Sequence, residues 1–332
     1  MTDHPARLKN LRLLPKVRDS WSYLYVDRCR IDQLHYAIAL HVERGVIPVP
    51  VASLNLLLLG PGTSITHAAI RTLADNGCLV GWVGEAGVRF YAAGLGETRS
   101  SRHLLHQASL WADPKARLET VVRMYRLRFD AGEIPAHYSL RQLRGREGLR
   151  VRAAYERASR ETGVPWHGRN YDARTHRMGD PVNRALSTAN ACLYGICHAA
   201  IVAAGYSPAI GFIHTGNMLS FVFDIADLYK TDLSIPVAFR VVADGVDRIE
   251  ERTRALCRDA FYRSRLLERI VDDLAVVLDD SPQAANVLEL VDAGFSPMWL
   301  WDPETEQVPA GVNYGDAEGQ ETGLGEASEF PD

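Results

Sequence analysis

Three side chains able to bind a metal ion or move a proton lie close together in residues 210–230, IGFIHTGNMLSFVFDIADLYK. Asp224 and Asp227 are three positions apart in a run that has the pattern of a helix, so both carboxylates emerge on nearly one face. Two carboxylates among apolar neighbours are costly without a positive partner, and a divalent cation, which prefers carboxylate oxygen, would supply one. The alternative is structural: Asp224 caps or hydrogen-bonds locally, and Asp227 pairs with Lys230.

His214 is the third candidate in this stretch. It ends the apolar run AIGFI and precedes Thr215 and Gly216, so its imidazole sits where a buried segment reaches a turn and can point into a cleft. A lone histidine is more often a satisfied core or surface residue. Near two carboxylates it becomes a candidate metal ligand, with its second nitrogen held by an outer acceptor.

Glu147 is the fourth candidate, because it lies among arginines that fall within twenty positions. Only Glu147 and Glu156 oppose them in this segment, whose arginines are Arg141, Arg144, Arg146, Arg150, Arg152, Arg157 and Arg160. The pattern fits a solvated helix face with ion pairs, and it equally fits a strip of guanidinium groups that faces phosphates. In the second case Glu147 would repel the DNA backbone unless a metal ion stood between them; in the first it is a surface ion pair.

The charge balance conceals a basic body. The chain has 332 residues and a formal net charge of −4, but residues 302–332 hold nine Asp or Glu and no Lys or Arg. Residues 1–301 therefore carry +5, which permits a polyanionic partner. The five cysteines are odd in number, sit in apolar surroundings and lack zinc-binding spacing, so we expect reduced core thiols.

No apolar run approaches the roughly 20 residues that a membrane-spanning helix needs, and residues 1–20 lack the apolar region of a signal peptide. We therefore expect a cytoplasmic protein without a membrane partner. The length exceeds what one hydrophobic core usually holds, so we also expect two domains.

The elements that must position these residues change in type along the chain. In residues 1–100, alternation in WSYLYVDR and YAIALHVE predicts half-buried antiparallel strands, and TSITHAAIRTLADNG predicts a helix. GPGTSIT lacks both phosphate-loop glycine patterns, so it indicates a tight turn into that helix. Residues 101–300 have a helical period and predict an α-helical catalytic domain. Residues 301–332 are acidic and glycine-rich and predict disorder. The fold class is α+β.

Several long motifs occur together and in order: GWVGEAGVRFYAAG, QLRGREGLRVRAAY, CLYG followed by AIVAAGYSPAIGFIHTG, and FVFDIADLYK. From roughly Trp21 to Asp280 the chain resembles the CRISPR-associated adaptation integrase and endonuclease family, "Cas-one", in its subtype I-E form. The resemblance implies an N-terminal β-sandwich and a C-terminal helical domain. It also implies a homodimer, and a complex in which two such dimers flank a dimer of a small ferredoxin-like partner, "Cas-two".

The resemblance also implies roles for particular residues. The family's metal-binding glutamate, histidine and aspartate fall on Glu147, His214 and Asp227, and Asp224 matches a second acidic position beside the metal. The positions implied to hold DNA are Arg89, Lys230, Arg254 and Arg258, with Tyr194 of CLYG near the active cleft.

The residue types and the resemblance predict the same chemistry. Mg²⁺ or Mn²⁺, held by two carboxylates and one imidazole, would polarise a phosphodiester while a DNA 3′-hydroxyl attacks it. This transesterification would join a captured double-stranded spacer to the CRISPR repeat. Two alternatives remain: a metal-dependent nuclease that hydrolyses branched DNA with water, and a non-catalytic DNA-binding scaffold that uses the arginines alone.

Overall fold

The structure is a computed structural model. By internal contacts the chain divides into two units, residues 1–288 and 289–332, which are described separately. The residues it describes are 22–34, 37–51, 54–85, 90–94, 101–129, 133, 135, 138–169, 180–279, 299–302 and 306–309.

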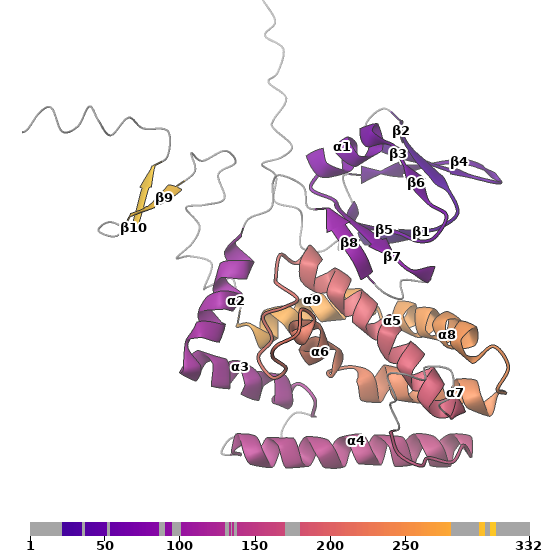
Figure 1. The fold of residues 1–332 in the computed structure, drawn as a ribbon, viewed down its shortest axis with the longest axis vertical. Helices are drawn as coiled ribbons and strands as arrows, with labels where there is room; N and C mark the ends of the chain where they lie inside the picture. Colours follow the sequence, from indigo (N-terminus) through magenta and orange to yellow (C-terminus); the bar gives the residue numbers. More distant parts are fainter. Residues whose placement is uncertain are drawn as a thin grey trace, which may run out of the picture. The chain divides into compact units, whose positions relative to one another are not determined.

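The first unit begins with two four-stranded sheets and one helix, α1 (His67–Asp75) (Figure 1). The first sheet has the order β1-β5-β7-β8, with bounds Ser22–Val26, Leu54–Leu59, Leu79–Val83 and Phe90–Gly94. The second has the order β4-β3-β2-β6, with bounds Gly45–Pro50, Ala37–Val42, Arg30–Leu34 and Ser64–Ile65. Helix α1 starts at Thr66, whose side chain accepts from the Ala69 amide, as a tight turn into a helix requires.

The expectation of antiparallel strands is correct for part of this region only. Strands β2, β3 and β4 pair antiparallel, as predicted for YAIALHVE. Strand β1, from WSYLYVDR, instead pairs parallel with β5, and β5 pairs parallel with β7. The physical reason is that neither pair is joined by a hairpin turn: β2, β3 and β4 lie between β1 and β5, and α1 lies between β5 and β7, so in each case the chain returns in the same direction.

Strand β5 explains why LNLLLL is almost continuously apolar. Leu57 and Leu59 belong to a core shared by both sheets and α1, while Leu56 and Leu58 belong to the core of the helical region. Because successive strand residues point to opposite faces, both faces of β5 are buried and both need apolar side chains. The first sheet is thus a layer between two cores.

The rest of the first unit is helical. Its elements are α2 (Arg102–Ala112), α3 (Pro114–Arg126), α4 (Leu140–Thr162), α5 (Pro181–Ala203), α6 (Ser220–Ala226), the π-helical turn η4 (Lys230–Ser234), α7 (Ile235–Ala243), α8 (Ile249–Arg263) and α9 (Leu266–Val277). Helix α4 begins in a capping box between Ser139 and Gln142 and ends at Gly163 in the left-handed conformation. The strand-rich region followed by helices confirms the predicted α+β fold class.

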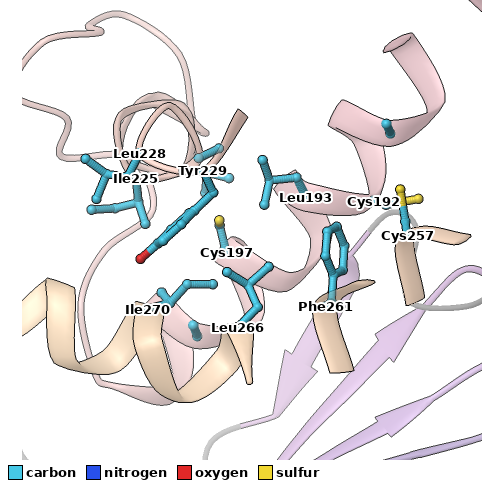
Figure 2. Packing of buried hydrophobic residues seen from close by; sticks show 14 of the residues in the cluster. Cys192, Leu193, Cys197, Ile225, Leu228, Tyr229, Cys257, Phe261, Leu266 and Ile270 are labelled. Carbon is cyan, nitrogen blue, oxygen red and sulfur yellow. The ribbon is translucent and has the colours of Figure 1, made fainter. Parts of the chain in front are cut away.

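Helix α5 is the centre of the helical core. Figure 2 shows Cys192, Leu193 and Cys197 of α5 facing Phe261 of α8 and Leu266 of α9, and all five are buried. All five cysteines of the chain are buried and free, which confirms the expectation of reduced core thiols. Burial raises the pKa of the Cys197 thiol, so this sulfur is kept in its unreactive protonated form.

Helix α5 is also long and apolar enough to cross a membrane, contrary to the expectation from the sequence. In the most apolar 18-residue window of this helix, 56% of the residues are buried inside the protein. The strand-forming and helical neighbours that pack on α5 account for that burial, so its composition is that of a core helix.

The second unit contains a short antiparallel hairpin of β9 (Trp299–Asp302) and β10 (Glu306–Pro309). The segment 301–332, predicted to be disordered, therefore carries paired strand as far as Pro309. Residues 310–332 lie outside the described residues, as do residues 95–100, where the boundary between the two predicted domains falls. The domain limits stay a prediction.

Candidate active site

Asp224 organises the loop that carries His214. Its Oδ2 accepts hydrogen bonds from the amides of Phe212 at 2.6 Å and Ile213 at 3.0 Å, and its Oδ1 accepts from the His214 amide at 2.8 Å. Oδ1 also lies 2.7 Å from Nδ1 of the His214 ring. The side chain of Asp224 is fully buried. Its carboxylate is therefore occupied by four nitrogen groups of one loop and orients the imidazole.

The loop can fold over Asp224 only because residue 211 is glycine. A Cβ on Gly211 would lie 2.4 Å from the carbonyl oxygen of His214 and 2.7 Å from Cβ of Ser220, distances that no side chain tolerates. Gly216 then turns the chain in the left-handed region, with φ of 82°. The two glycines that flank His214 thus have identifiable backbone roles.

The orientation of His214 leaves its other ring nitrogen directed toward Asp227. The His214 Nε2 atom lies 4.0 Å from Asp227 Oδ2. The hydrogen bond to Asp224 raises the pKa of His214 above its ordinary value; burial opposes this, and the nearby Asp227 carboxylate adds to the increase. The histidine of the predicted set therefore contacts both aspartates, as the three-residue spacing indicated.

Asp227 follows the last turn of α6 and has cations on two sides. Its Oδ1 accepts from Lys230 Nζ at 2.6 Å, and its Oδ2 lies 3.8 Å from Arg128 Nη2. Lys230 opens the π-helical turn η4, and its Nζ also lies 5.0 Å from the centre of the Tyr194 ring. Burial alone would lower the pKa of Lys230, but Asp227 and Tyr194 outweigh it and raise the pKa, so Lys230 stays charged.

Glu147 enters from α4. Its Oε1 accepts from Arg128 Nη1 at 3.2 Å, and its Oε2 accepts from Arg150 Nε at 3.0 Å. Arg150 in turn donates to Thr231 Oγ1 at 2.7 Å, which ties α4 to η4. Glu147 is only 14% exposed on its side chain, so it is not the solvated surface ion pair of the structural alternative.

Arg128 is the residue that sequence reasoning missed. It lies two residues beyond α3, its side chain is 3% exposed, and it contacts both Glu147 and Asp227. The sequence did contain an indication of its burial. Val121, Met124 and Tyr125 are buried at helical spacing, and position 128 falls on the same side of the helix. A charge at a core position needs a buried partner, which here is the pair of acids.

The donor types suit a hard divalent cation: two carboxylates, Glu147 and Asp227, contact one buried guanidinium, and the His214 imidazole lies beside Asp227. Within the described residues, however, no group of three or more His, Cys, Asp or Glu lies close enough to hold an ion. In this arrangement Arg128, Arg150 and Lys230 supply the positive charge. Arg128 joins Glu147 to Asp227, and Asp227 in turn lies 4.0 Å from His214 Nε2, but the three predicted ligands do not share a common point.

The structure separates the predicted DNA-binding residues into two groups. The cluster of Asp224, Asp227, Glu147 and His214 with Arg128, Arg150 and Lys230 is called the centre below. Lys230 belongs to it, Tyr194 lies beside Lys230, and the Tyr194 ring packs edge-on against Phe223. Arg254 and Arg258 are on α8, where Arg254 pairs with Glu85 at 3.3 Å and the 63% exposed Arg258 lies 3.4 Å from Asp259. Arg89 lies outside the described residues.

The arginines of α4 present positive charge to solvent. Six of the seven are exposed, and Arg150 is half-buried. Among the described residues, Arg146 pairs with Glu133 and Arg150 with Glu147, while the other five have no ion pair. A helix face stabilised by its own ion pairs would show more of them, so the exposed guanidinium groups favour a polyanionic partner.

The chain is an α+β protein in which a centre of acids and a histidine lies near a helix with exposed arginines, an arrangement that suits a polyanionic ligand. The family model described as "CRISPR associated protein Cas1" matches residues 122–255, which include Arg128, Glu147, His214 and Asp227. The chain belongs to this family of CRISPR-associated endonucleases, because relatives that are far more than 30% identical cover most of its length.

Two curated relatives and one solved structure illustrate the likeness. The chain is 52% identical over 309 residues to "CRISPR-associated endonuclease Cas1 2" of Thermus thermophilus, covering 92% of this chain and 94% of the relative. It is 41% identical over 303 residues to "CRISPR-associated endonuclease Cas1" of Escherichia coli, covering 91% and 95%. The structure "Crystal structure of TtCas1-DNA complex" aligns with a TM-score of 0.73 at 54% identity, covering 80% of this chain and 99% of that one.

Proposed function

We propose that the protein is a metal-dependent DNA integrase and endonuclease of CRISPR adaptation, of subtype I-E. It joins the 3′-hydroxyl ends of a captured spacer to the CRISPR repeat by transesterification. The observation that carries the proposal is the series of contacts that joins Glu147 through Arg128 to Asp227 and the Asp224-oriented His214, next to the exposed arginines of α4. Membership of the Cas1 family supports the same chemistry.

Each residue of the centre has a task in this reaction. Glu147, His214 and Asp227 would hold Mg²⁺ or Mn²⁺, which when bound supplies a Lewis acid beside the scissile phosphate. Asp224 orients the imidazole so that Nε2 is the nitrogen available to the ion. Lys230 keeps a positive charge beside Asp227, where it can stabilise charge that develops on the phosphate oxygens.

The reaction exchanges one phosphodiester for another. The oxygen of the attacking 3′-hydroxyl forms the new bond to phosphorus as the bond to the displaced 3′-oxygen breaks, and the proton of the attacking hydroxyl ends on the oxygen that leaves. The number of phosphodiesters is unchanged, so no external energy source is required. The arginines of α4 would hold the DNA backbone through phosphate contacts.

The expected partners follow from this role. We expect double-stranded DNA as substrate, a homodimer of this chain, and the small ferredoxin-like protein "Cas-two" as assembly partner in the cytoplasm. The similar TtCas1 structure is a complex with DNA, which supports DNA as the ligand class. The exposed arginines of α4 support it independently.

The test is a joining assay with a 3′-hydroxyl duplex, the partner protein and a plasmid that contains the repeat. Replacing Glu147, His214 or Asp227 with Ala should abolish joining in Mg²⁺ or Mn²⁺ while binding of the duplex survives. Asp272→Asn is the matched control, because this exposed acid of α9 should leave joining unchanged. Cleavage of branched DNA without joined product would favour the nuclease alternative. Unchanged activity of all three variants would favour the scaffold.

A further inference from the structure

The guanidinium group of Arg128 lies between the carboxylates of Glu147 and Asp227. Arg128 Nη1 donates to Glu147 Oε1 at 3.2 Å, and Arg128 Nη2 lies 3.8 Å from Asp227 Oδ2. Glu147 comes from α4 and Asp227 from the end of α6. Among the described residues, Arg128 is the cation that contacts both acids.

The hydrogen bonding of Arg128 is incomplete for a buried arginine. Its side chain is 3% exposed, yet Nε and Nη2 have no hydrogen-bond partner among the described residues. One face of the guanidinium lies over the Tyr125 ring, with 4.9 Å between the guanidinium carbon and the ring centre. Buried donors without acceptors are costly, and an arginine kept only to rigidify a core would have them satisfied.

The burial of Arg128 is explained by its charge and not by its hydrogen bonds. Glu147 and Asp227 are mostly buried, and a buried carboxylate that loses its counter-charge strongly destabilises a fold. The attraction between opposite charges at these separations is large in a partly buried site. Arg128 therefore supplies positive charge that both acids share, in addition to Arg150 beside Glu147 and Lys230 beside Asp227.

The same two acids cannot serve a guanidinium and a metal ion fully at once. Oxygens that ligate Mg²⁺ or Mn²⁺ must approach the ion directly, whereas Glu147 Oε1 now accepts from Arg128. This agrees with the absence, among the described residues, of a group of three ligands close enough to hold an ion. In this arrangement Arg128 supplies to both acids positive charge of the kind that a divalent cation would supply.

We propose that Arg128 is a resident counter-cation of the centre, which holds Glu147 and Asp227 in the metal-free protein and competes with a divalent cation for them. The inference rests on the proposed function in one respect, namely that these two acids are metal ligands. Arg128 is a positioning residue: it sets the affinity of the centre for the ion, and it withdraws from the carboxylates when the ion binds.

The experiment measures Mn²⁺ binding by calorimetry and thermal unfolding with and without Mn²⁺, on the full chain after removal of metal with a chelator. Arg128→Met keeps the length of the side chain and removes its charge, and Arg128→Lys keeps the charge. Arg123→Met is the matched control, since Arg123 is an arginine of the neighbouring α3 that bonds the Val277 carbonyl and Thr120. Glu147→Ala reports on the metal site itself.

Competition predicts a specific pattern. Arg128→Met should lower the melting temperature of the metal-free protein and bind Mn²⁺ at least about tenfold more tightly than the unmodified chain, because the ion no longer displaces a cation. Its melting temperature should therefore rise more on adding Mn²⁺. Arg128→Lys and Arg123→Met should bind Mn²⁺ with nearly unchanged affinity.

Other results separate failure of this inference from failure of the proposed function. Equal or weaker Mn²⁺ binding by Arg128→Met, with binding abolished by Glu147→Ala, would leave the metal site standing and overturn the competition. An absence of Mn²⁺ binding in both the unmodified chain and Arg128→Met would remove the metal from the proposed function and this inference with it. Mn²⁺ binding by Arg128→Met, with no detectable binding by the unmodified chain, would support competition between Arg128 and the ion.

A second variant keeps the test decisive if Arg128→Met does not fold. Arg128→Met leaves the centre with three carboxylates and two cations, Arg150 and Lys230, and adding Glu147→Gln removes that excess negative charge. If the role of Arg128 is to balance that charge, the double variant should fold and melt at a higher temperature than Arg128→Met alone. Failure of Glu147→Gln to rescue folding would show that Arg128 acts through packing, and would overturn the inference.

Discussion

Replacing Asp224 with Asn is the sharpest test of the way the centre is held. The side chain changes little in size, but one of its two acceptor oxygens becomes an amide group that can only donate. Each oxygen of Asp224 now faces two nitrogen groups, with contacts between 2.6 and 3.0 Å. If the amide replaces Oδ2, the amides of Phe212 and Ile213 lose their acceptor; if it replaces Oδ1, the His214 amide loses its acceptor and the ring must switch Nδ1 from donor to acceptor.

The magnitude follows from the type of bond that is lost. A hydrogen bond to a charged group contributes roughly 1.5–3 kcal/mol, so the loss of one or two such bonds in a fully buried site predicts a destabilisation of about 1.5–6 kcal/mol. That is a large part of the roughly 5–15 kcal/mol that stabilises a typical domain. The loop of residues 212–214 would loosen, and the imidazole of His214 would lose its fixed orientation.

Urea unfolding of the metal-free chain measures this change, and Mn²⁺ titration measures its effect on the centre. We expect the unfolding midpoint of Asp224→Asn to fall by the amount that this energy implies. We also expect Mn²⁺ affinity to fall by about 10–100-fold, as for other residues that orient a metal-binding histidine. Asp272→Asn, an exposed acid, should change stability by less than about 0.5 kcal/mol. A loss below about 1 kcal/mol for Asp224→Asn would refute the role assigned to this carboxylate.

Two further predictions concern pH and salt. Because the pKa of His214 is raised above its ordinary value of 6.5, its pairing with Asp224 stabilises the metal-free chain fully below that value and loses this effect as pH rises through the raised pKa. Mn²⁺ affinity should change in the opposite direction over the same window, since only neutral imidazole ligates, and calorimetry at several pH values would reveal a pH-independent affinity if His214 is not a ligand. Arg157→Gln, on the exposed face of α4, should weaken DNA binding and reduce the slope of log affinity against log salt by about one unit, and an unchanged slope in salt titrations would exclude a phosphate contact.

Local sequence patterns predicted whether most segments form a helix or a strand, because that choice depends largely on residues that are close together in the sequence. The alternation of YAIALHVE and the helical period after residue 101 gave strands and helices where the structure has them. The direction of strand pairing was not available in the same way. WSYLYVDR alternates as an antiparallel strand would, but its parallel pairing with β5 depends on how β2, β3 and β4, which lie between the two strands in the chain, return it to the first sheet.

The centre could be predicted only in part for a similar reason. The spacing of Asp224 and Asp227 correctly placed both near His214, because all three lie on one helix and the loop before it. The spacing did not show that Asp224 holds the loop of residues 212–214 whereas Asp227 pairs with Lys230 and Arg128, because this difference depends on how the loop folds over Asp224. Glu147 was singled out because it is an acid among the arginines of residues 141–160, and the resemblance gave it the role of a metal ligand; no local pattern indicates that α4 packs beside η4. Arg128 was missed because its position in the helical repeat is that of a core residue, whereas an arginine is a residue type expected at the surface.

The charges of the centre also explain how such a cluster can exist in a folded chain before any ion binds. Its three carboxylates, Asp224, Glu147 and Asp227, are matched in number by the cations Arg128, Arg150 and Lys230. With His214 neutral the cluster is formally balanced, which avoids the penalty of unpaired buried charge. A divalent cation would then add two positive charges to a neutral cluster. That surplus, beside the exposed arginines of α4, would attract a phosphate of the DNA backbone, so ion binding and DNA binding should each strengthen the other.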